Sequence, residues 1–399
     1  MDLARSAIDS TLQTVPMRIA QVAPLYERVP PSGYGATERI VHYLTEALVQ
    51  NGHEVTLFAS ADSQTSAALV PCCPRALWHD HEVKDTLVHH VAQLERVAAR
   101  AFAFDVVHFH TEPMHLPLAS RLESPCLTTL HGEIRPYDLG ALLEVADDAP
   151  LISISNSQRR PAPRANWIAT IPHGLPDDAF EPHASHDGYL LWMGRMMPGK
   201  GPDAAIEIAR RARKPLKIAA AVHPGERAWF ETQIRPLMVR HGHFVEYFGE
   251  VGGALRSQLL RHAQAVLMPI AWEEPFGLVM IEALACATPV IAYRRGAVPE
   301  VIEDGVTGYI VDGIEDAVRA VAKLPELDRA RCRAEFERRF TASRMADDYL
   351  RAYAAVMSRD VGRGVGRDVG RRVGHGAARE AAHEVGCGAG REVGQSGRV

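Results

Sequence analysis

The strongest chemical pattern in this chain is a pair of glutamates, Glu274 and Glu282, on either side of a Pro-Phe-Gly-Leu turn. The apolar run 266–270 precedes them, so the pattern predicts a strand, a tight turn and a helix that begins at Pro275. Free N–H groups at such a helix end bind anions such as a diphosphate. The candidates for this are the N–H groups of Phe276, Gly277 and Leu278.

The positions of the two glutamates suit a sugar and a ribose. Glu282 would lie roughly 7.5 Å beyond Gly277 at 1.5 Å rise per residue, which suits a carboxylate that binds ribose hydroxyls beside a diphosphate. Glu274, on the turn itself, would face a sugar. Spacing alone leaves a second interpretation equally open, in which both glutamates are solvated charges that flank an amphipathic helix.

A second cluster places two cations in a glycine-rich turn, Arg195 and Lys200 within the run 194–201. The turn follows a predicted strand and leads into a helix at Pro202. An arginine fork binds two phosphate oxygens, while a lysine ammonium supplies a mobile point charge. The cluster therefore predicts a phosphate site, and the alternative is a pair of surface cations at a helix start.

Turns after strands of the first half also carry candidate residues. Gly33, Gly35 and Thr37 follow the first strand, where a doubly wound domain usually meets its ligand. Thr37 is equally well explained as the N-cap of the next helix, and the two interpretations are compatible. His131 and His173 each end a predicted strand directly before a glycine. They are candidates for the same cleft, with a structural role as the alternative.

Together these motifs resemble the family-4 retaining glycosyltransferases of group 1. The resemblance rests on the string Glu-Pro-Phe-Gly-Leu-x-x-x-Glu and the small residues after it, and it extends from about Met17 to Met357. It implies the two-domain GT-B fold and a hexosyltransferase that moves a sugar from a UDP- or GDP-sugar to an acceptor hydroxyl with retention of configuration. The acceptor would be a carbohydrate, lipid-linked or small molecule, and the expected setting is synthesis of cell-envelope polysaccharide or glycoconjugates.

The resemblance also implies roles for single residues. The donor diphosphate would be held by Arg195, Lys200, Phe276, Gly277 and Leu278, and the ribose by Glu282. Glu274 and His131 are the expected catalytic residues beside the reacting sugar, and His173 is a further cleft candidate. The family's Gly-Gly-Thr-Glu loop matches the segment that ends in Thr37 and Glu38, except that Ala36 replaces the second glycine.

Neither a metal nor a cofactor is expected. The string Asp-x-Asp is absent, so the charge of a diphosphate would be met by the protein's own cations and a helix N-terminus. His108 and His110 alternate on one predicted strand without acidic neighbours, and we expect them to be core or rim residues rather than metal ligands.

Three other functions fit parts of the pattern. A sugar-nucleotide epimerase on the same fold would need no acceptor, although the glutamate motif disfavours it. A dinucleotide oxidoreductase would need Gly-x-Gly-x-x-Gly after the first strand, and residues 32–38 do not supply it. A non-catalytic sugar-nucleotide or glycan-binding protein would not need the intact set of charged residues.

The elements that must position these residues alternate between short apolar runs and amphipathic helical stretches. This is the pattern of parallel sheets covered by helices, and it predicts two doubly wound, Rossmann-like α/β domains that face each other across a cleft. The predicted strands are 18–23, 54–59, 106–110, 127–130, 151–154 and 167–171 in the first half and 189–193, 216–222, 244–247, 265–269 and 289–292 in the second.

Composition along the chain predicts six segments. These are an extension over 1–16, an N-terminal acceptor-side domain over 17–178, a linker over 179–188, a nucleotide-sugar-binding domain over 189–342, a helix over 343–357 and a Gly/Arg-rich disordered tail over 358–399. The helix carries an apolar stripe that we expect to pack back on the N-terminal domain, formed by Met345, Tyr349, Leu350 and Tyr353.

The whole-chain numbers exclude several classes of protein. A hydrophobic content of 47% with 23% charged residues is that of a globular chain. A net charge of -5 gives no reason to bind nucleic acid. The six cysteines show no C-x-x-C spacing of a zinc or redox site, and the N-terminal stretch lacks the pattern of a secretion signal. The cytoplasm is therefore the expected location. Two interpretations of the arginine-bearing tail remain. Either the tail makes peripheral contact with anionic lipid, or it has no role.

Overall fold

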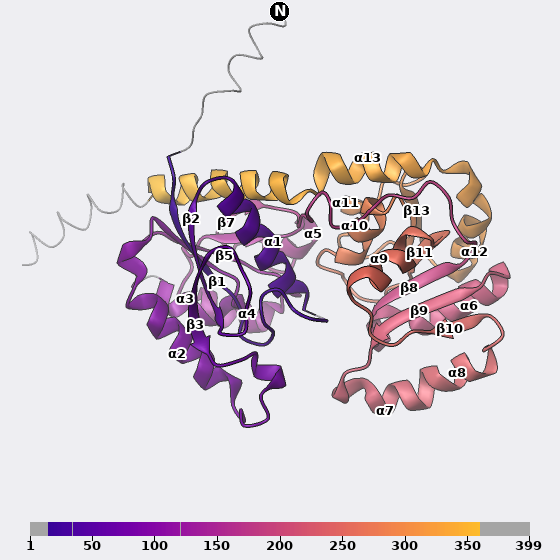
Figure 1. Ribbon diagram of the computed structural model, residues 1–399, viewed down its shortest axis with the longest axis horizontal. Helices are drawn as coiled ribbons and strands as arrows, with labels where there is room; N and C mark the ends of the chain where they lie inside the picture. Colours follow the sequence, from indigo (N-terminus) through magenta and orange to yellow (C-terminus); the bar gives the residue numbers. More distant parts are fainter. Residues whose placement is uncertain (1–14, 34, 120, 360–399) are drawn as a thin grey trace, which may run out of the picture.

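The structure, a computed structural model, describes residues 15–359 except 34 and 120. The predicted tail beyond 359 and the first fourteen residues of the predicted extension lie outside this part of the chain. The described chain folds around two parallel sheets that lie side by side, each with helices around it (Figure 1). No helix in the described ranges is long and apolar enough to cross a membrane.

The first sheet has seven strands in the order β3-β2-β1-β4-β5-β6-β7. Every pairing in it is parallel. Its strands are β1 (Arg18–Val22), β2 (Glu54–Ser60), β3 (Ala68–Cys73), β4 (Val106–Phe109), β5 (Cys126–Thr129), β6 (Leu151–Ser153) and β7 (Trp167–Thr170). The sequence missed β3, an edge strand that contains Pro71 and is largely exposed at its start. Proline and exposure both weaken a strand signal, and edge positions tolerate both.

The second sheet has six strands in the order β10-β9-β8-β11-β12-β13, again all parallel. Its strands are β8 (Leu190–Arg195), β9 (Leu216–Ala221), β10 (Val245–Tyr247), β11 (Ala265–Met268), β12 (Val290–Tyr293) and β13 (Gly308–Val311). The unpredicted strand here is β13, which is short and also lies at an edge. In both sheets the strands that carry candidate residues agree with the predicted ones to within a residue or two.

Helices surround both sheets. Around the first are α1 (Ala36–Gln50), α2 (Thr86–Ala98), α3 (Leu116–Ala119), α4 (Pro136–Leu143) and α5 (Asn156–Arg159). Around the second are α6 (Pro202–Ala212), α7 (Arg227–Trp229), α8 (Arg235–Arg240), α9 (Gly253–Arg261), α10 (Leu278–Ala285), α11 (Val298–Val301), α12 (Ile314–Lys323) and α13 (Arg329–Arg339). Along β8, Leu191 and Met193 belong to one buried cluster while Leu190 and Trp192 belong to another, so both faces of the strand are covered.

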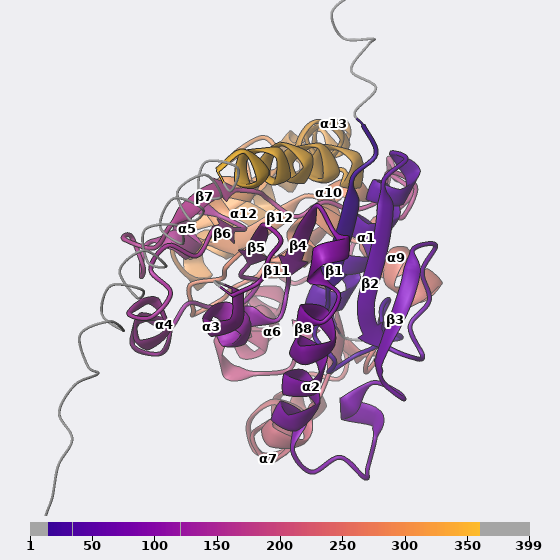
Figure 2. The ribbon, with the colours of Figure 1, turned by 90° about the vertical axis from the view of Figure 1, so that its left-hand side faces the viewer.

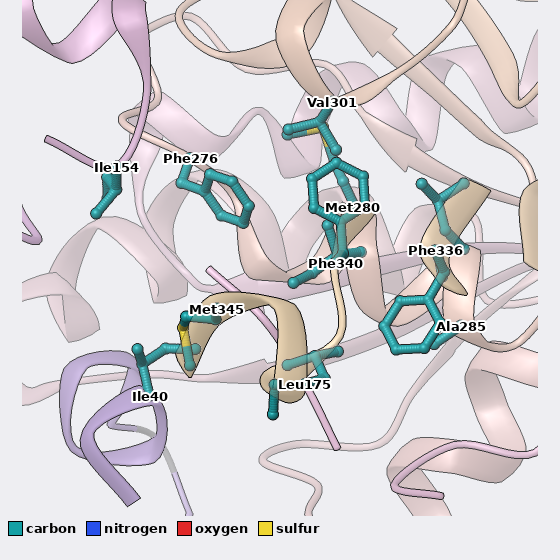
Figure 3. Close-up of a cluster of buried hydrophobic side chains, with 14 of the residues drawn as sticks. Ile40, Ile154, Leu175, Phe276, Met280, Ala285, Val301, Phe336, Phe340 and Met345 are labelled. Carbon is teal, nitrogen blue, oxygen red and sulfur yellow. The ribbon is translucent and has the colours of Figure 1, made fainter. Parts of the chain in front are cut away.

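One hydrophobic cluster runs through both halves of the molecule. It contains Ile40 of α1 and Met345 from one side and Met280 of α10 and Phe336 of α13 from the other (Figure 3). Leu175 lies between them. The two sheets therefore share part of one core.

The chain passes between the two halves twice, and the two crossings are hydrogen bonded to each other. The N–H of Leu175 donates to the carbonyl of Phe340 at 2.9 Å, and the N–H of Ala342 donates to the carbonyl of Leu175 at 2.7 Å. Gly174 allows this approach, because a Cβ atom there would overlap the carbonyl oxygen of Thr341. The two crossing segments thus form one hydrogen-bonded joint between the two halves.

The helix over 342–359 follows this joint and runs along the first sheet (Figures 1 and 2). Met345, Tyr349 and Tyr353 are fully buried, and Leu350 is partly buried. Tyr353 contacts β1 through Gln21, whose side-chain nitrogen donates to the tyrosine hydroxyl at 2.9 Å. The last helix is thus in contact with the first sheet although it follows the second in sequence.

Candidate active site

A cavity of about 410 Å³ lies between the two sheets and is lined by residues from both halves. The turns that follow the strands reach it, which is where open α/β sheets bind ligands. Every candidate that the sequence singled out lines this one cavity: Gly33, Gly35, Thr37, His131, His173, Arg195, Lys200, Glu274, Phe276, Gly277, Leu278 and Glu282. Residues separated by more than two hundred positions are therefore brought to a single site.

Glu274 is buried and forms an ion pair with Lys200. The same carboxylate oxygen accepts a hydrogen bond from the indole nitrogen of Trp272 at 3.1 Å. The Lys200 ammonium also lies 4.6 Å from the centre of the Trp272 ring. The two charges of the predicted sugar and phosphate subsites thus compensate each other, and an incoming diphosphate would compete with the carboxylate for the ammonium.

The turn before α10 differs from the sequence expectation. The helix begins at Leu278 rather than at Pro275, and Gly277 occupies the N-cap position with a φ of 85°. The backbone of Glu274 explains the delay, because its carbonyl accepts from the N–H of Ala297 at 2.9 Å and holds the turn away from helical geometry. The anion-binding N–H groups of the helix end therefore start one turn later than predicted, still within the cavity.

Arg195 ends β8 and forms an ion pair with Glu226, which precedes α7. About a third of the arginine side chain, 34%, is exposed, and its Nε atom is buried without a hydrogen-bond partner among the described residues. An unpartnered guanidinium N–H at the wall of a cavity has unused capacity to donate to an anion. Glu226 was not anticipated, because nothing local in the sequence pairs it with Arg195.

Glu282 is almost fully buried and is held by Arg256 of α9. The Nε atom of Arg256 donates to Oε1 of Glu282 at 3.2 Å, and a second contact joins the other pair of atoms. Arg256 also lines the cavity, although nothing in the sequence marks it beyond its charge on an amphipathic helix. A buried carboxylate held by such a partner keeps a fixed orientation.

Three aromatic side chains that line the cavity contact one another. The rings of His131 and His173 stack with their centres 5.2 Å apart, and His173 meets Phe276 edge-on at 4.9 Å. Burial lowers the pKa of His131 to about 3 and, together with His131 and Arg344, holds the pKa of His173 well below its ordinary range. Both imidazoles are therefore neutral at physiological pH.

A hydrogen-bond relay fixes which nitrogen of His131 carries the proton. The Oε1 atom of Gln21 accepts from Nε2–H of His110 at 2.7 Å, so the Nδ1 atom of this neutral ring is an acceptor. It accepts from Nε2–H of His131 at 2.8 Å. The Nδ1 atom of His131 then carries a lone pair, and it has no hydrogen-bond partner among the described residues.

The relay continues to the last helix. The hydroxyl of Tyr353, which accepts from Gln21, lies 2.9 Å from Nδ1 of His108. On its other side, Nε2 of His108 lies 2.8 Å from the Thr129 hydroxyl, which in turn contacts the hydroxyl of Tyr349 at 2.9 Å. His108 and His110 are fully buried, which agrees with the expectation of core residues.

Glu112 is a further residue that the sequence did not indicate. It has a φ of 52°, a left-handed conformation that non-glycine residues rarely adopt. Its Oε1 atom accepts from the backbone N–H groups of His131 at 3.3 Å and Gly132 at 3.1 Å. Burial raises the pKa of this carboxyl. Glu112 therefore fixes the turn that carries His131, and it lines the cavity itself.

The glycine loop after β1 also meets the cavity, with one correction. Helix α1 begins at Ala36 with Gly35 as its N-cap and without a side-chain cap, so the interpretation of Thr37 as N-cap was wrong. Gly35 has a φ of 151°, and a Cβ there would press on Pro31. The guanidinium of Arg39 donates to the carbonyl of Gly33 at 2.6 Å and steadies the loop.

No group of His, Cys, Asp or Glu side chains within the described ranges has an arrangement that would hold a metal ion. The cations that line the cavity and could meet the charge of a bound diphosphate are Arg39, Arg195, Lys200 and Arg256.

Comparison with known families covers most of the chain in two parts. The family model of glycosyl transferases group 1 matches residues 177–339, and that of glycosyltransferase family 4 matches residues 37–169. A glycogen synthase of Mycobacterium tuberculosis is 27% identical over 81% of this chain and 90% of its own length. A D-inositol 3-phosphate glycosyltransferase of Arthrobacter is 26% identical over 78% and 84% of the two chains.

Solved structures share the arrangement of the two sheets. AviGT4, a glycosyltransferase involved in avilamycin A biosynthesis, superposes with a TM-score of 0.65 at 24% identity over 86% of this chain and 98% of its own. A sucrose-phosphate synthase of Thermosynechococcus elongatus gives a TM-score of 0.71 at 19% identity over 86% of this chain and all of its own. HepE of Anabaena, solved with UDP-glucose, gives 0.66 at 16% identity over 85% of this chain and all of its own.

Proposed function

Because the chain belongs to the family-4 type of group 1 glycosyltransferases and has the GT-B fold, we propose that it transfers a hexose from a nucleoside diphosphate to an acceptor hydroxyl with retention of configuration. The observation that carries this proposal is the single cavity that collects the cations, the glutamates and the histidines from both domains. The neighbour solved with UDP-glucose makes this the first donor to test.

In this proposal the second domain binds the donor. Arg195, Lys200 and the N–H groups that begin α10 meet the diphosphate, so its charge is balanced by the protein without a metal. Glu282, oriented by Arg256, accepts hydrogen bonds from the ribose hydroxyls. The same groups stabilise the leaving diphosphate as charge develops on it in the transition state.

The reacting sugar lies between Glu274 and His131. The bond from the anomeric carbon to the diphosphate breaks, the acceptor oxygen bonds to that carbon on the same face, and the acceptor proton passes to an oxygen of the departing phosphate. Glu274 orients the sugar hydroxyls and steadies the positive charge on the ring. The lone pair on Nδ1 of His131 accepts from a further sugar hydroxyl, because its tautomer is fixed by the relay.

The experiment is a donor panel of UDP- and GDP-hexoses, with release of the nucleoside diphosphate measured in the presence of acceptor mixtures. The anomeric configuration of the product is then read from its proton coupling constant by NMR. We expect turnover with one nucleotide class and an unchanged configuration. An inverted product would overturn the retaining mechanism, and absence of binding to UDP and GDP alike would overturn the donor site.

A further inference from the structure

A second cavity of about 690 Å³ adjoins the first and is also built by both domains. The first domain contributes Glu27, Trp78 and His79, and the second contributes His223 and Glu250 after two of its strands. Gly33 lines both cavities and so lies where they meet. The Glu250 carboxylate comes so close to Gly33 that a Cβ atom there would displace Oε1, so the two walls nearly touch at this glycine.

Trp78 offers a fixed aromatic surface in this cavity. Half of the side chain, 50%, is exposed, although the residue belongs to the short helix η1 (Leu77–His79) that is tied to the loop after β1. The N–H groups of Leu77 and Trp78 donate to the carbonyls of Leu25 at 2.9 Å and Tyr26 at 3.1 Å. A rigid, half-exposed indole can bind the apolar face of a sugar ring, and it also attracts cations.

Glu27 provides a buried acceptor beside this ring. Its side chain is 8% exposed, and Oε1 accepts from Nε2–H of His79 at 2.8 Å. Its Oε2 atom is buried and has no hydrogen-bond partner in the described part of the chain. Burial and the nearby Glu250 raise the pKa of Glu27. A bound donor of positive charge would relieve both the missing hydrogen bond and the repulsion between the carboxylates.

The charge of this lining excludes a large class of ligands. Two carboxylates line the cavity, and neither lysine nor arginine is among the described residues that do so. A phosphate group would bring two further negative charges next to Glu27 and Glu250. The first cavity differs, because four cations, Arg39, Arg195, Lys200 and Arg256, are among its lining residues. The cleft is thus divided into an anion-binding part and a cation-binding part.

We propose, on the basis of the proposed transferase function, that this second cavity is the acceptor subsite and that it takes an amine-bearing sugar or cyclitol. The ring lies on Trp78, and the ammonium group donates to Oε2 of Glu27. A hydroxyl of the same ring is directed past Gly33 toward the donor cavity.

The test uses the full chain saturated with UDP at pH 6.5, and titrations followed by saturation-transfer NMR. D-glucosamine, D-glucose and D-glucose 6-phosphate differ chiefly in charge. We expect glucosamine to bind about threefold more tightly than glucose and at least about tenfold more tightly than glucose 6-phosphate. UDP binding is measured by calorimetry for each protein sample.

Matched variants assign the preference to residues. Glu27→Gln should remove the advantage of glucosamine over glucose, and Trp78→Ala should weaken both sugars about tenfold. Glu250→Gln, expected to reduce the same advantage, serves if Glu27→Gln does not fold. Phe102→Ala is the control, because this aromatic side chain is 70% exposed and outside both cavities.

The outcomes separate the two proposals. Equal binding of glucosamine and glucose 6-phosphate, or variants without effect on glucosamine while UDP still binds, would overturn the acceptor subsite and leave the donor site standing. Failure of wild-type protein to bind UDP would instead overturn the proposed function, and the acceptor subsite with it.

Discussion

At the scale of single residues, three cations of the cavity between the two sheets are each paired with a carboxylate. Lys200 is paired with Glu274, Arg195 with Glu226, and Arg256 with Glu282. A buried ion pair contributes little net stability, and loss of one partner leaves the other uncompensated. A substitution of one of these residues therefore changes ligand binding and also leaves its ion-pair partner without a counter-charge. A suitable control removes a residue from an ion pair outside the cavity.

Arg195→Ala is expected to weaken UDP binding roughly tenfold or more, since a charge-assisted hydrogen bond is worth about 1.5–3 kcal/mol. Titration calorimetry measures the affinity for UDP. Arg210→Ala is the matched control, because Arg210 is also paired with a glutamate of the second domain but lies on its surface outside the cavity. Equal UDP affinity in Arg195→Ala and wild type would contradict the diphosphate role.

Glu274→Gln is expected to lower turnover rather than the affinity for UDP. The substitution keeps the shape of the side chain but removes the charge at the sugar, so turnover should fall by about a hundredfold or more. It also frees Lys200 from its ion pair, so UDP should bind at least as tightly as it does to wild type. Initial rates at saturating donor beside UDP calorimetry check both statements, and full turnover would remove Glu274 from the mechanism.

At the scale of elements, the last helix contributes to a site that it does not line. Tyr353 accepts from Gln21, and this fixes which end of the Gln21 amide faces His110. Without that contact the amide can turn, His110 can change tautomer, and the lone pair of His131 moves to the nitrogen that faces His110. The helix therefore positions a lone pair at the cavity wall through Gln21, His110 and His131.

Tyr353→Phe is expected to lower kcat several-fold with UDP affinity unchanged, and to alter the ¹⁵N chemical shifts of the His131 ring nitrogens. Tyr349→Phe is the matched control on the same helix, because its hydroxyl contacts Thr129 on the far side of His108. If Tyr353 had only a structural role, both variants would lose the same fraction of kcat and the tautomer of His131 would not change.

The sequence predicted the local parts of this architecture. The strand that ends at Arg195, the strands that precede His131 and His173, and the turns after them were found because apolar runs and glycines mark them within a few residues. Arg256, Glu226 and Glu112 were missed, because their roles come from pairings between segments distant in sequence. The start of α10 was misplaced for the same kind of reason, since a hydrogen bond from Ala297 holds the turn open.

At the scale of the whole molecule, the two crossings of the chain form the joint between the domains. Gly174→Ala would force the carbonyl of Thr341 away, and overpacking of this kind costs about 1–3 kcal/mol. We expect a lower melting temperature by calorimetry, and altered turnover if the domains shift. Gly225→Ala is the control, because a Cβ there meets nothing within 4 Å. Equal melting of both variants would show that the joint tolerates the added methyl group.

Stability is also expected to depend on pH through the buried histidines. Burial lowers the pKa of His115 and His131 to about 3 and of His108, His110 and His173 well below 6.5. The unfolded chain binds more protons than the folded one below about 6.5, so the free energy of unfolding falls as the pH falls through that range. Each histidine contributes at most about 1.4 kcal/mol per pH unit.

Three carboxyls act in the opposite direction, because the pKa of Glu27, Glu38 and Glu112 is raised in the folded protein. Burial raises the pKa of Glu38 to about 7, so its contribution is lost as the pH rises from about 4.5 to 7. The five histidines outnumber the three carboxyls, so the free energy of unfolding should be larger at pH 7 than at pH 5. Urea unfolding at pH 7, 6 and 5 measures the slope. His115→Asn, a substitution outside the cavity between the two sheets, should reduce this slope by the amount that corresponds to about one proton. A flat profile in wild type would contradict the prediction that these histidines are neutral in the folded protein.

The joint at Leu175 and Ala342 has a consequence for recombination between relatives. The first domain is assembled from two separate stretches of chain, 17–174 and 342–359, because the final helix supplies Tyr349 and Tyr353 to its interior. A hybrid enzyme made with one junction near 175 would join the sheet of one parent to the closing helix of another. Two junctions, one at each crossing, would transfer the first domain as an intact building block together with Tyr353, which sets the tautomer of its histidine.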